Sequence, residues 1–205
     1  PTCVTGLIRV DTYSHWSWFG QFVIISLIQI GGIGFMTLCI YILTLAKKKI
    51  GIISRSIMQN SISSPQVGGI VKITKFIIWG TFIIEAIGAF LLSLVFCPRF
   101  GFLKGIWFSI FHSISAFCNA GFDLMGTIEP FNSLISYQDS WYVNLIIMSL
   151  IVIGGLGFLV WRDIVDSHFN FKKMRLHTKL VITVTLILIF GGTFVIYLCE
   201  QGNAT

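Results

Sequence analysis

Side chains that could do chemistry are few in this sequence, and they form no familiar catalytic or metal-binding pattern. The cysteines at positions 3, 39, 97, 118 and 199 show no C-x-x-C pairing, whereas disulfide scaffolds and zinc sites need clustered ligands. His112 has no second His or Cys spaced to join it. We therefore interpret His112 as a packed polar residue, and we expect no resident metal and no cofactor.

The other candidate for chemistry is the backbone of residues 111–122, Phe-His-Ser-Ile-Ser-Ala-Phe-Cys-Asn-Ala-Gly-Phe. The apolar run before it, residues 105–110, is too short to cross a bilayer, because a spanning helix needs roughly 20 residues. One interpretation is a pore helix followed by an extended loop that exposes its carbonyls. The other is an ordinary extracellular loop with a half-buried helix. This stretch alone leaves both interpretations open.

The composition indicates a membrane protein. The chain is 55% hydrophobic and 11% charged, with a mean hydropathy of +0.88, whereas soluble domains carry about 25% charged residues. Apolar stretches predict helices at about 18–46, 75–97, 141–161 and 180–199. The sequence starts without an initiator methionine, and we expect it to be a fragment.

Basic residues indicate the orientation in the membrane. Residues 47–75 contain six Lys or Arg and residues 162–179 contain five, so that three of the 14 lie elsewhere. Basic loops stay in the cytoplasm, which predicts a multi-pass plasma-membrane protein with residues 111–122 opening to the outside. This distribution also explains the net charge of +6 without nucleic-acid binding, which we do not expect.

An internal repeat organises the chain. The run Ile-Gly-Gly-Ile-Gly-Phe at 30–35 returns as Ile-Gly-Gly-Leu-Gly-Phe at 153–158, and Thr-Gly-Leu at 5–7 is matched by Ala-Gly-Phe at 120–122. Repeats of this kind define structural units. The repeat predicts an all-α membrane protein built from helix–pore-loop–helix units, and it favours the pore-loop interpretation of residues 111–122.

Several of these motifs resemble the Trk/Ktr family of potassium-uptake proteins. The resemblance rests on Val-Thr-Gly-Leu at 4–7, on Gln-Ile-Gly-Gly-Ile-Gly-Phe-Met-Thr at 29–37 and, most specifically, on Ser-Ala-Phe-Cys-Asn-Ala-Gly-Phe-Asp at 115–123. It implies four units around a pseudo-fourfold pore, of which this chain holds an incomplete set. It further implies potassium as the transported ion, a homodimer at full length, and a cytoplasmic nucleotide-binding regulatory subunit as partner.

The resemblance assigns each segment to a unit. Residues 1–46 would be the filter loop and second helix of repeat one, residues 47–73 a cytoplasmic linker, and residues 74–165 a complete repeat two. Residues 166–205 would be a second linker and the first helix of repeat three. Within repeat two we expect a helix at about 75–97, a pore helix at about 105–117, a filter at 118–122 and a helix at about 141–165.

The resemblance places the ion-binding backbone in the two filter loops, with Gly6 and Gly121 as the key positions and ordinary turn glycines as the alternative. The full set is Val4, Thr5, Gly6, Leu7, Cys118, Asn119, Ala120, Gly121 and Phe122. A second set of glycines lacks the spacing of a nucleotide-binding loop and is expected to pack helices closely: Gly31, Gly32, Gly34, Gly154, Gly155 and Gly157.

Four polar residues are candidates for supporting roles: Glu85, His112, Ser113 and Asp123. Glu85 is the single acid within an expected span, and such groups are functional candidates. It could pair with His112 or Ser113, or form a structural hydrogen bond to a neighbouring helix. Asp123 could attract cations at the outer mouth or be a solvated loop acid.

Three classes of function compete for this sequence. The first is potassium transport through a carbonyl-lined filter, in contact with the lipid bilayer. The second is a membrane-embedded enzyme, which would need His, Asp or Cys gathered at one membrane depth, and we expect none. The third is a membrane subunit of a larger sodium- or proton-translocating, ATPase-associated complex.

Overall fold

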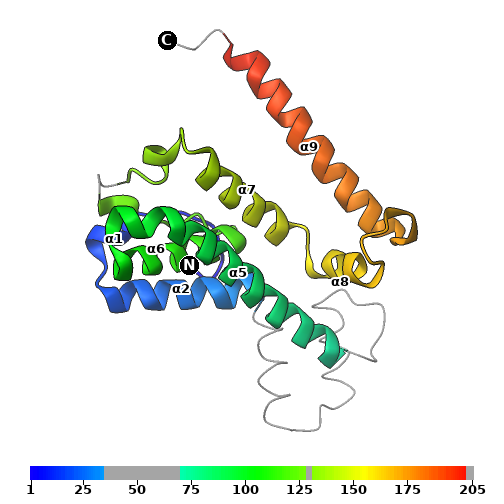
Figure 1. Ribbon diagram of the computed structural model, residues 1–205, viewed down its shortest axis with the longest axis horizontal. Coiled ribbons are helices and arrows are strands. Elements are labelled where there is room, and N and C mark those ends of the chain that lie inside the picture. The colour runs from blue at the N-terminus through cyan, green and yellow to red at the C-terminus, as the bar shows by residue number, and fades with distance from the viewer. Residues whose placement is uncertain (35–69, 128–130, 202–205) are drawn as a thin grey trace. The chain divides into compact units, whose positions relative to one another are not determined.

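The computed structural model describes residues 1–34, 70–127 and 131–201 (Figure 1). All regular elements in these ranges are helices and none is a strand, which confirms the all-α prediction. Among the described residues, two helices are long and apolar enough to cross a membrane, and a broken pair, α7 and α8, could supply a third. The second half of the first predicted span and almost all of the linker at 47–73 lie outside the described residues. The chain forms two compact units, residues 1–155 and residues 156–205.

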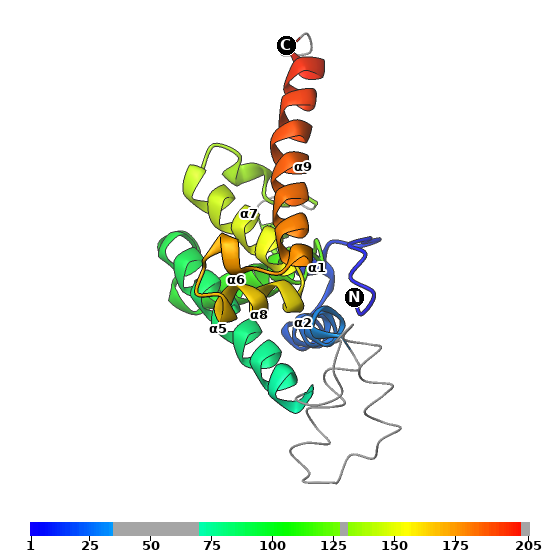
Figure 2. The same ribbon diagram turned by 90° about the vertical axis from the view of Figure 1, so that its right-hand side faces the viewer.

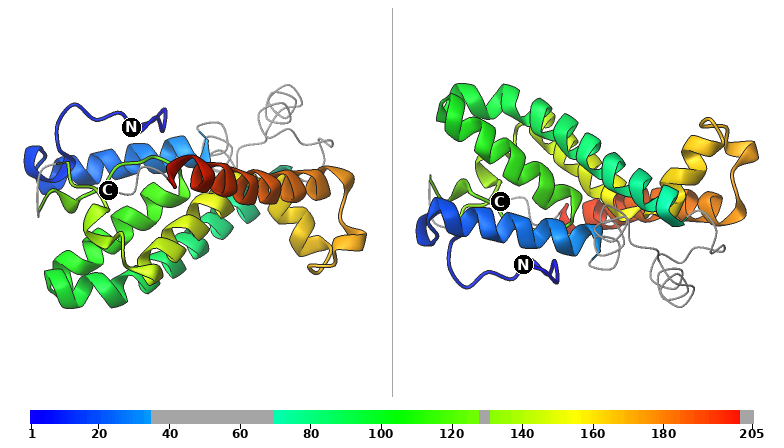
Figure 3. Two further views of the ribbon diagram at one scale, coloured as in Figure 1. Left: turned by 90° about the horizontal axis from the view of Figure 1, so that it is seen from above. Right: turned by 90° about the horizontal axis from the view of Figure 1, so that it is seen from below.

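In the first unit, α6 (Phe102–Phe117) is the central helix and packs against α2 (Trp18–Ile33), α5 (Ile70–Phe100) and α7 (Trp141–Gly155). The views from above and below show α6 lying between α2 and α5 (Figure 3). Short elements complete the unit: α1 (Thr12–His15), η1 (Met125–Thr127) and η2 (Ile135–Tyr137). The central position buries the aromatic rings of Phe108 and Phe111 completely.

A tight hairpin joins α5 to α6. Gly101, with φ 84°, separates the two helices, and Gly105 lies so close to α5 that a Cβ there would be 2.5 Å from Cys97 Cα. The helix α5 is longer at both ends than the expected 75–97. Pro98 falls within its last turn, where the chain can continue helically after losing one N–H donor, and the left-handed Gly101 ends the helix instead.

Residues 141–166 form two helices, α7 and α8 (Phe158–Asp166), in place of the single helix expected at about 141–165. The reason is Gly157, whose φ of 88° is incompatible with a right-handed helix. Gly34, the equivalent residue of the first repeat, ends α2 with φ 86°. Gly34 is the C-cap of α2 and Gly157 the N-cap of α8, so the repeated glycine lies at a helix boundary at both positions.

The second unit contains α8, η3 (Phe171–Lys173) and the long helix α9 (Leu176–Glu200) (Figure 2). Asp163 ties α8 to the start of α9, because its carboxylate accepts the Arg175 N–H at 2.9 Å and also pairs with the Arg175 guanidinium at 3.6 Å. Thr178 is the single residue of α9 that is buried in the structure. The rest of this apolar helix is therefore available to lipid or to other protein helices.

Candidate functional site

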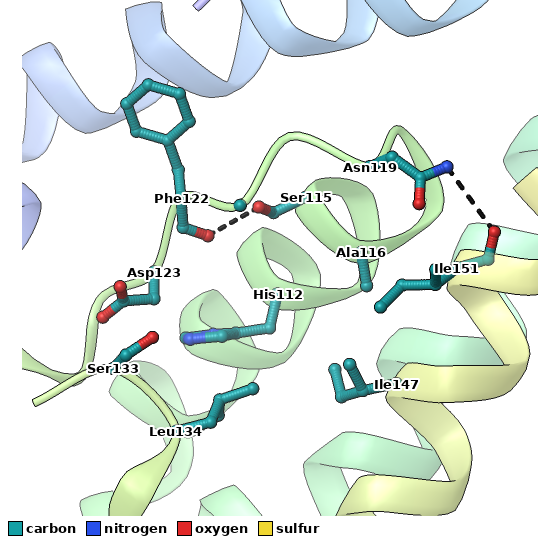
Figure 4. A pocket seen from close by; sticks show the side chains of 11 residues that line it. His112, Ser115, Ala116, Asn119, Phe122, Asp123, Ser133, Leu134, Ile147 and Ile151 are labelled. Atoms are coloured by element: carbon teal, nitrogen blue, oxygen red, sulfur yellow. Dashed lines mark hydrogen bonds between the residues drawn. The ribbon is translucent and has the colours of Figure 1, made fainter. Parts of the chain in front are cut away.

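The segment 118–122, here called the second loop, begins where α6 ends in a Schellman motif. Asn119 is left-handed, and its N–H bonds to the Ala116 carbonyl at 3.1 Å. The next N–H, of Ala120, bonds to the Ser115 carbonyl at 2.8 Å. These bonds satisfy carbonyls that a helix end leaves unpaired. The Ser115 hydroxyl also donates to the Phe122 carbonyl at 2.5 Å (Figure 4), so both ends of the loop are held by the last turn of α6.

The segment 4–7, here called the first loop, has the same unusual backbone pattern as the second. Val4 (φ 52°) and Gly6 (φ 68°) are left-handed, as are their equivalents Asn119 (φ 56°) and Gly121 (φ 73°). In each loop the residue between these two is not left-handed. Positive φ is uncommon outside glycine. A backbone that alternates between left-handed residues and residues with negative φ turns successive peptide carbonyls towards one side of the chain, and glycine permits this conformation.

The two loops meet at their glycines. A Cβ on Gly6 would lie 2.8 Å from the carbonyl oxygen of Ala120, and one on Gly121 would lie 3.5 Å from Gly6 Cα. The other members differ in exposure, since Leu7 is 86% exposed and Thr5 is also exposed, whereas three residues of the second loop are buried: Cys118, Ala120 and Phe122. Segments separated by more than 100 positions in the sequence thus place their backbones in contact.

Glycines of the two repeats also lie against the two loops in equivalent ways. The Cα of Gly31 in α2 faces the carbonyl of Thr2, and a Cβ there would overlap this oxygen. Gly154 in α7 faces the carbonyl of Phe117 in the same manner. In the repeat alignment Thr2 corresponds to Phe117, so each second helix contacts the residue that precedes its own loop by one or two positions.

The remaining repeat glycines have different surroundings. Gly32 lies against the side chain of Cys118, leaving no room for a Cβ, while a Cβ on Gly155 would meet only Asn119 Nδ2, at 3.9 Å. Gly34 and Gly157 instead have positive φ and lie at helix boundaries, Gly34 after α2 and Gly157 before α8. The glycine set predicted for helix packing therefore divides into residues that contact the loops and residues that break helices.

Glu85 lies in the middle of α5 and is buried, with 4% of its surface exposed. Its carboxylate accepts hydrogen bonds from Gln29 Nε2, at 2.9 Å to each oxygen. Of the two partners expected from the sequence, Ser113 does bond to Glu85, but through its hydroxyl and the Glu85 backbone carbonyl at 2.7 Å. The carboxylate therefore forms a bond between helices, to α2.

His112 uses both ring nitrogens within the protein. Its Nδ1 lies 2.7 Å from the Phe108 carbonyl, and its Nε2 accepts the Leu124 N–H at 3.4 Å. Since a carbonyl can only accept, Nδ1 carries the proton and the ring is the neutral tautomer. The aromatic rings of Phe96, Phe108 and Phe111 surround it. The described part of the chain contains no group of three metal-ligating side chains.

Asp123 is buried, and its carboxylate accepts the Met125 N–H at 3.0 Å, which does not fit a solvated loop acid. Together with His112 it borders a cavity of about 260 Å³ between α6, the second loop and α7, also lined by Ser133 and Ile147. Figure 4 shows these side chains around the space behind the loop. The cavity lies against the loop on the side of α7.

Two glutamines that the sequence interpretation did not select form hydrogen bonds from α2 to neighbouring helices. Gln29 reaches Glu85, and Gln21, two turns earlier in α2, accepts the Trp107 indole N–H at 3.0 Å. The sequence does contain a pattern that could have identified them. The two glutamines are eight positions apart, which places two polar side chains near one face of an otherwise apolar helix. Another residue not selected, Asp11, accepts the N–H groups of Ser14 at 2.7 Å and Phe131 at 3.3 Å.

Comparison with known proteins gives one family. Residues 1–201 match the family model TrkH, described as a cation transport protein. The chain is 45% identical over 201 residues to the potassium/sodium uptake protein NtpJ of Enterococcus hirae, which covers 98% of this chain and 43% of that protein. It is 41% identical to Ktr system potassium uptake protein B of Bacillus subtilis, over 98% of this chain and 44% of that protein. It is 33% identical to Ktr system potassium uptake protein B of Vibrio alginolyticus, over 98% of this chain and 43% of that protein.

The chain thus spans less than half the length of these relatives. The family match extends over nearly all of it and includes both loops and the repeated glycine motifs. The resemblance seen in the sequence is therefore confirmed, and this chain belongs to the TrkH family of cation transport proteins.

Proposed function

We propose that this chain is part of a potassium-uptake transporter and that its two loops are two of the four loops that line a selectivity filter. In this proposal four helix–pore-loop–helix units surround a pseudo-fourfold axis. The present chain supplies the loops of repeats one and two, at residues 4–7 and 118–122. The names of the relatives, potassium or potassium/sodium uptake proteins, support this class of ion.

The observation that carries the proposal is the matched backbone of the two loops. Left-handed residues occur at Val4 and Gly6 and at the equivalent Asn119 and Gly121, and the two glycines are in contact. Rows of backbone carbonyls can replace the water shell of potassium. Irregular backbone at membrane depth is tolerated where it faces a cavity or buried protein, and a filter provides such a cavity.

The charge distribution around the second loop also suits a cation. The C-terminal end of α6, which carries a partial negative charge, leads directly into the loop. Residues 4–7 and 118–122 contain no acidic side chain, so discrimination between ions would depend on the number and field strength of the carbonyls and not on a ring of charges.

The whole transporter requires partners that this chain alone cannot supply. We propose that the full-length protein is a homodimer in the plasma membrane, with its filter loops facing outside and its basic loops in the cytoplasm. The Ktr relatives are named as parts of a system, which supports a separate regulatory subunit. We propose that this subunit binds nucleotide and docks on the cytoplasmic face at the loops 47–75 and 162–179, of which the first lies mostly outside the described residues.

The test is rubidium uptake by the full-length protein carrying Gly121→Ala. Alanine at φ 73° is strained, so the loop should change shape. Uptake should then lose selectivity for rubidium over sodium by about 5- to 30-fold, since this strain is on the order of 1–2 kcal/mol. Gly101→Ala is the matched control, because Gly101 has φ 84° but a Cβ there would meet nothing within 4 Å.

Equal selectivity in the Gly121→Ala and Gly101→Ala proteins, at equal amounts in the membrane, would contradict the assignment of the second loop. An intact protein that transports neither rubidium nor sodium, tested together with its regulatory subunit, would contradict the proposed transport activity itself.

A further inference from the structure

Glu85 is a buried carboxylate that no cation neutralises in the described part of the chain. It lies in the middle of α5 and has 4% of its surface exposed. The two ion pairs found among the described residues are Arg162–Asp166 and Arg175–Asp163, so Glu85 is not in either. A carboxylate removed from water requires compensating hydrogen bonds, and Gln29 supplies them from α2, at 2.9 Å to both oxygens.

The Gln29–Glu85 pair joins elements of different repeats. Gln29 belongs to the second helix of repeat one and Glu85 to the first helix of repeat two. Neither is close to the other in sequence, since 56 positions separate them. The bond is therefore a direct link between two repeats, made by side chains that the sequence interpretation did not pair.

The same pair lies directly behind the start of the second loop. The Cys118 thiol is 3.9 Å from Glu85 Oε1, and it lies against Gly32, one turn after Gln29 in α2. On the other side, the Ser113 hydroxyl donates to the Glu85 backbone carbonyl at 2.7 Å. Cys118, the first residue of the loop, is thus enclosed between α2 and α5 at the level of the Gln29–Glu85 bond.

The direction of the hydrogen bonds is fixed by the chemistry of the pair. Gln29 donates with Nε2 to both carboxylate oxygens, since an amide N–H can only donate, and its Oε1 is left buried with no hydrogen-bond partner among the described residues. Any change that puts two acceptors or two carboxylates face to face would push α2 and α5 apart. Because Cys118 lies beside this bond, such a movement would be transmitted to the second loop.

We propose that Gln29 and Glu85 are positioning residues for the second loop, holding it against repeat one so that its carbonyls keep the spacing that selects the ion. This inference rests on the proposed transport function and adds determinants of selectivity outside both loops. The pair acts through Cys118 and Ser113 and does not itself touch the transported ion.

The test measures selectivity in the full-length transporter with its regulatory subunit, as the ratio of the apparent affinities for rubidium and sodium. Gln29→Glu places two carboxylates together and should lower this ratio about tenfold. Glu85→Gln keeps a hydrogen-bonding partner and should lower it less. The exchanged double variant, Gln29→Glu with Glu85→Gln, restores one acceptor opposite one donor and should recover most of the wild-type ratio.

Gln21→Glu is the matched control. It makes the same chemical change at a buried position of the same helix and likewise removes an Nε2 donor, here the one to the Trp16 carbonyl. A carboxylate at position 21 can still accept the Trp107 indole N–H, and it lies two turns away from the Gln29–Glu85 pair. It should leave the affinity ratio unchanged even if the amount of protein in the membrane falls. A general loss of stability would lower the maximal rate of all variants without changing this ratio.

The outcomes separate this inference from the proposed function. If Gln29→Glu keeps the wild-type ratio, or if the double variant is no better than Gln29→Glu alone, the positioning role is wrong while transport stands. If the wild-type transporter moves neither ion under the same conditions, the proposed function fails before the variants are considered.

Discussion

Replacing Gly154 by alanine tests the contact between α7 and the second loop. The Cα of Gly154 faces the carbonyl of Phe117, and a Cβ there would overlap both the oxygen and the carbon of that group, the latter at 2.9 Å. Backbone cannot rotate away as a flexible side chain can. Phe117 is the last residue of α6, directly before the loop, so the added methyl group must displace the loop or α7.

The expected size of the destabilisation by Gly154→Ala follows from this overlap. Adding a methylene-sized group to a packed interior costs about 1–3 kcal/mol, which is roughly a 5- to 150-fold change in an equilibrium. Gly→Ala within a helix otherwise stabilises by about 0.5–1 kcal/mol. Gly154→Ala should therefore lower both the thermal stability of the purified full-length protein and its rubidium uptake.

The neighbouring glycine provides the control. A Cβ on Gly155 would meet only Asn119 Nδ2, at 3.9 Å, which is an ordinary contact, so Gly155→Ala should be neutral or slightly stabilising. The assay is thermal unfolding of the detergent-purified protein combined with uptake per molecule in liposomes. Equal stability and equal uptake in the Gly154→Ala and Gly155→Ala proteins would refute the close approach of α7 to Phe117.

Two further predictions concern the ends of the second loop and the outer connections. Ser115→Ala removes the donor to the Phe122 carbonyl and should lower the free energy of unfolding by about 1–3 kcal/mol, because a buried acceptor is left unpaired. Thermal unfolding measures this loss, and Ser149→Ala at an exposed position is the control. Burial raises the pKa of Asp11, but the hydrogen bonds from Ser14 and Phe131 outweigh it and lower the pKa below its ordinary value. The stability that Asp11 contributes is therefore full above about pH 4, the ordinary pKa of aspartate, and is lost as the pH falls through the lower folded-state pKa. Asp11→Asn should destabilise the protein at neutral pH and make its stability less dependent on pH in acid. If the stability of this variant falls in acid as steeply as that of the wild-type protein, the assignment is wrong.

The sequence was informative where a single local pattern decides the structure. The repeated Gly-Gly-x-Gly motif pointed to close approach, and Gly31 and Gly154 do lie against backbone carbonyls. A short apolar run predicted a half-length helix, and α6 has 16 residues. Both features follow from residue type and run length, which a sequence displays directly.

The sequence could not distinguish glycines that pack from glycines that end a helix. Gly34 and Gly157 belong to the same motif as Gly31 and Gly154, yet they take φ values near 90° and break the helices. Glycine permits both roles, and the choice depends on whether a neighbouring backbone occupies the space. That neighbour comes from another part of the chain, so its position was not visible in the sequence.

Contacts between segments that are distant in the sequence could likewise not be predicted from it. Glu85 was expected either to pair with His112 or Ser113 or to form a hydrogen bond to a neighbouring helix. The structure has the second arrangement, with Gln29 of α2 opposite the carboxylate, and the sequence had not indicated Gln29. A polar residue in an apolar span indicates that some partner exists. Which partner it is depends on how the helices are arranged in space.

The central claim is that the carbonyls of residues 4–7 and 118–122 bind the transported cation. Its most direct test is a structure of the full-length protein crystallised in rubidium, with the ion located by anomalous diffraction. The account predicts rubidium peaks at coordinating distance from the carbonyl oxygens of both loops, near Gly6 and Gly121. Rubidium bound elsewhere along the pore, with neither loop coordinating an ion in a protein that still transports rubidium, would contradict it.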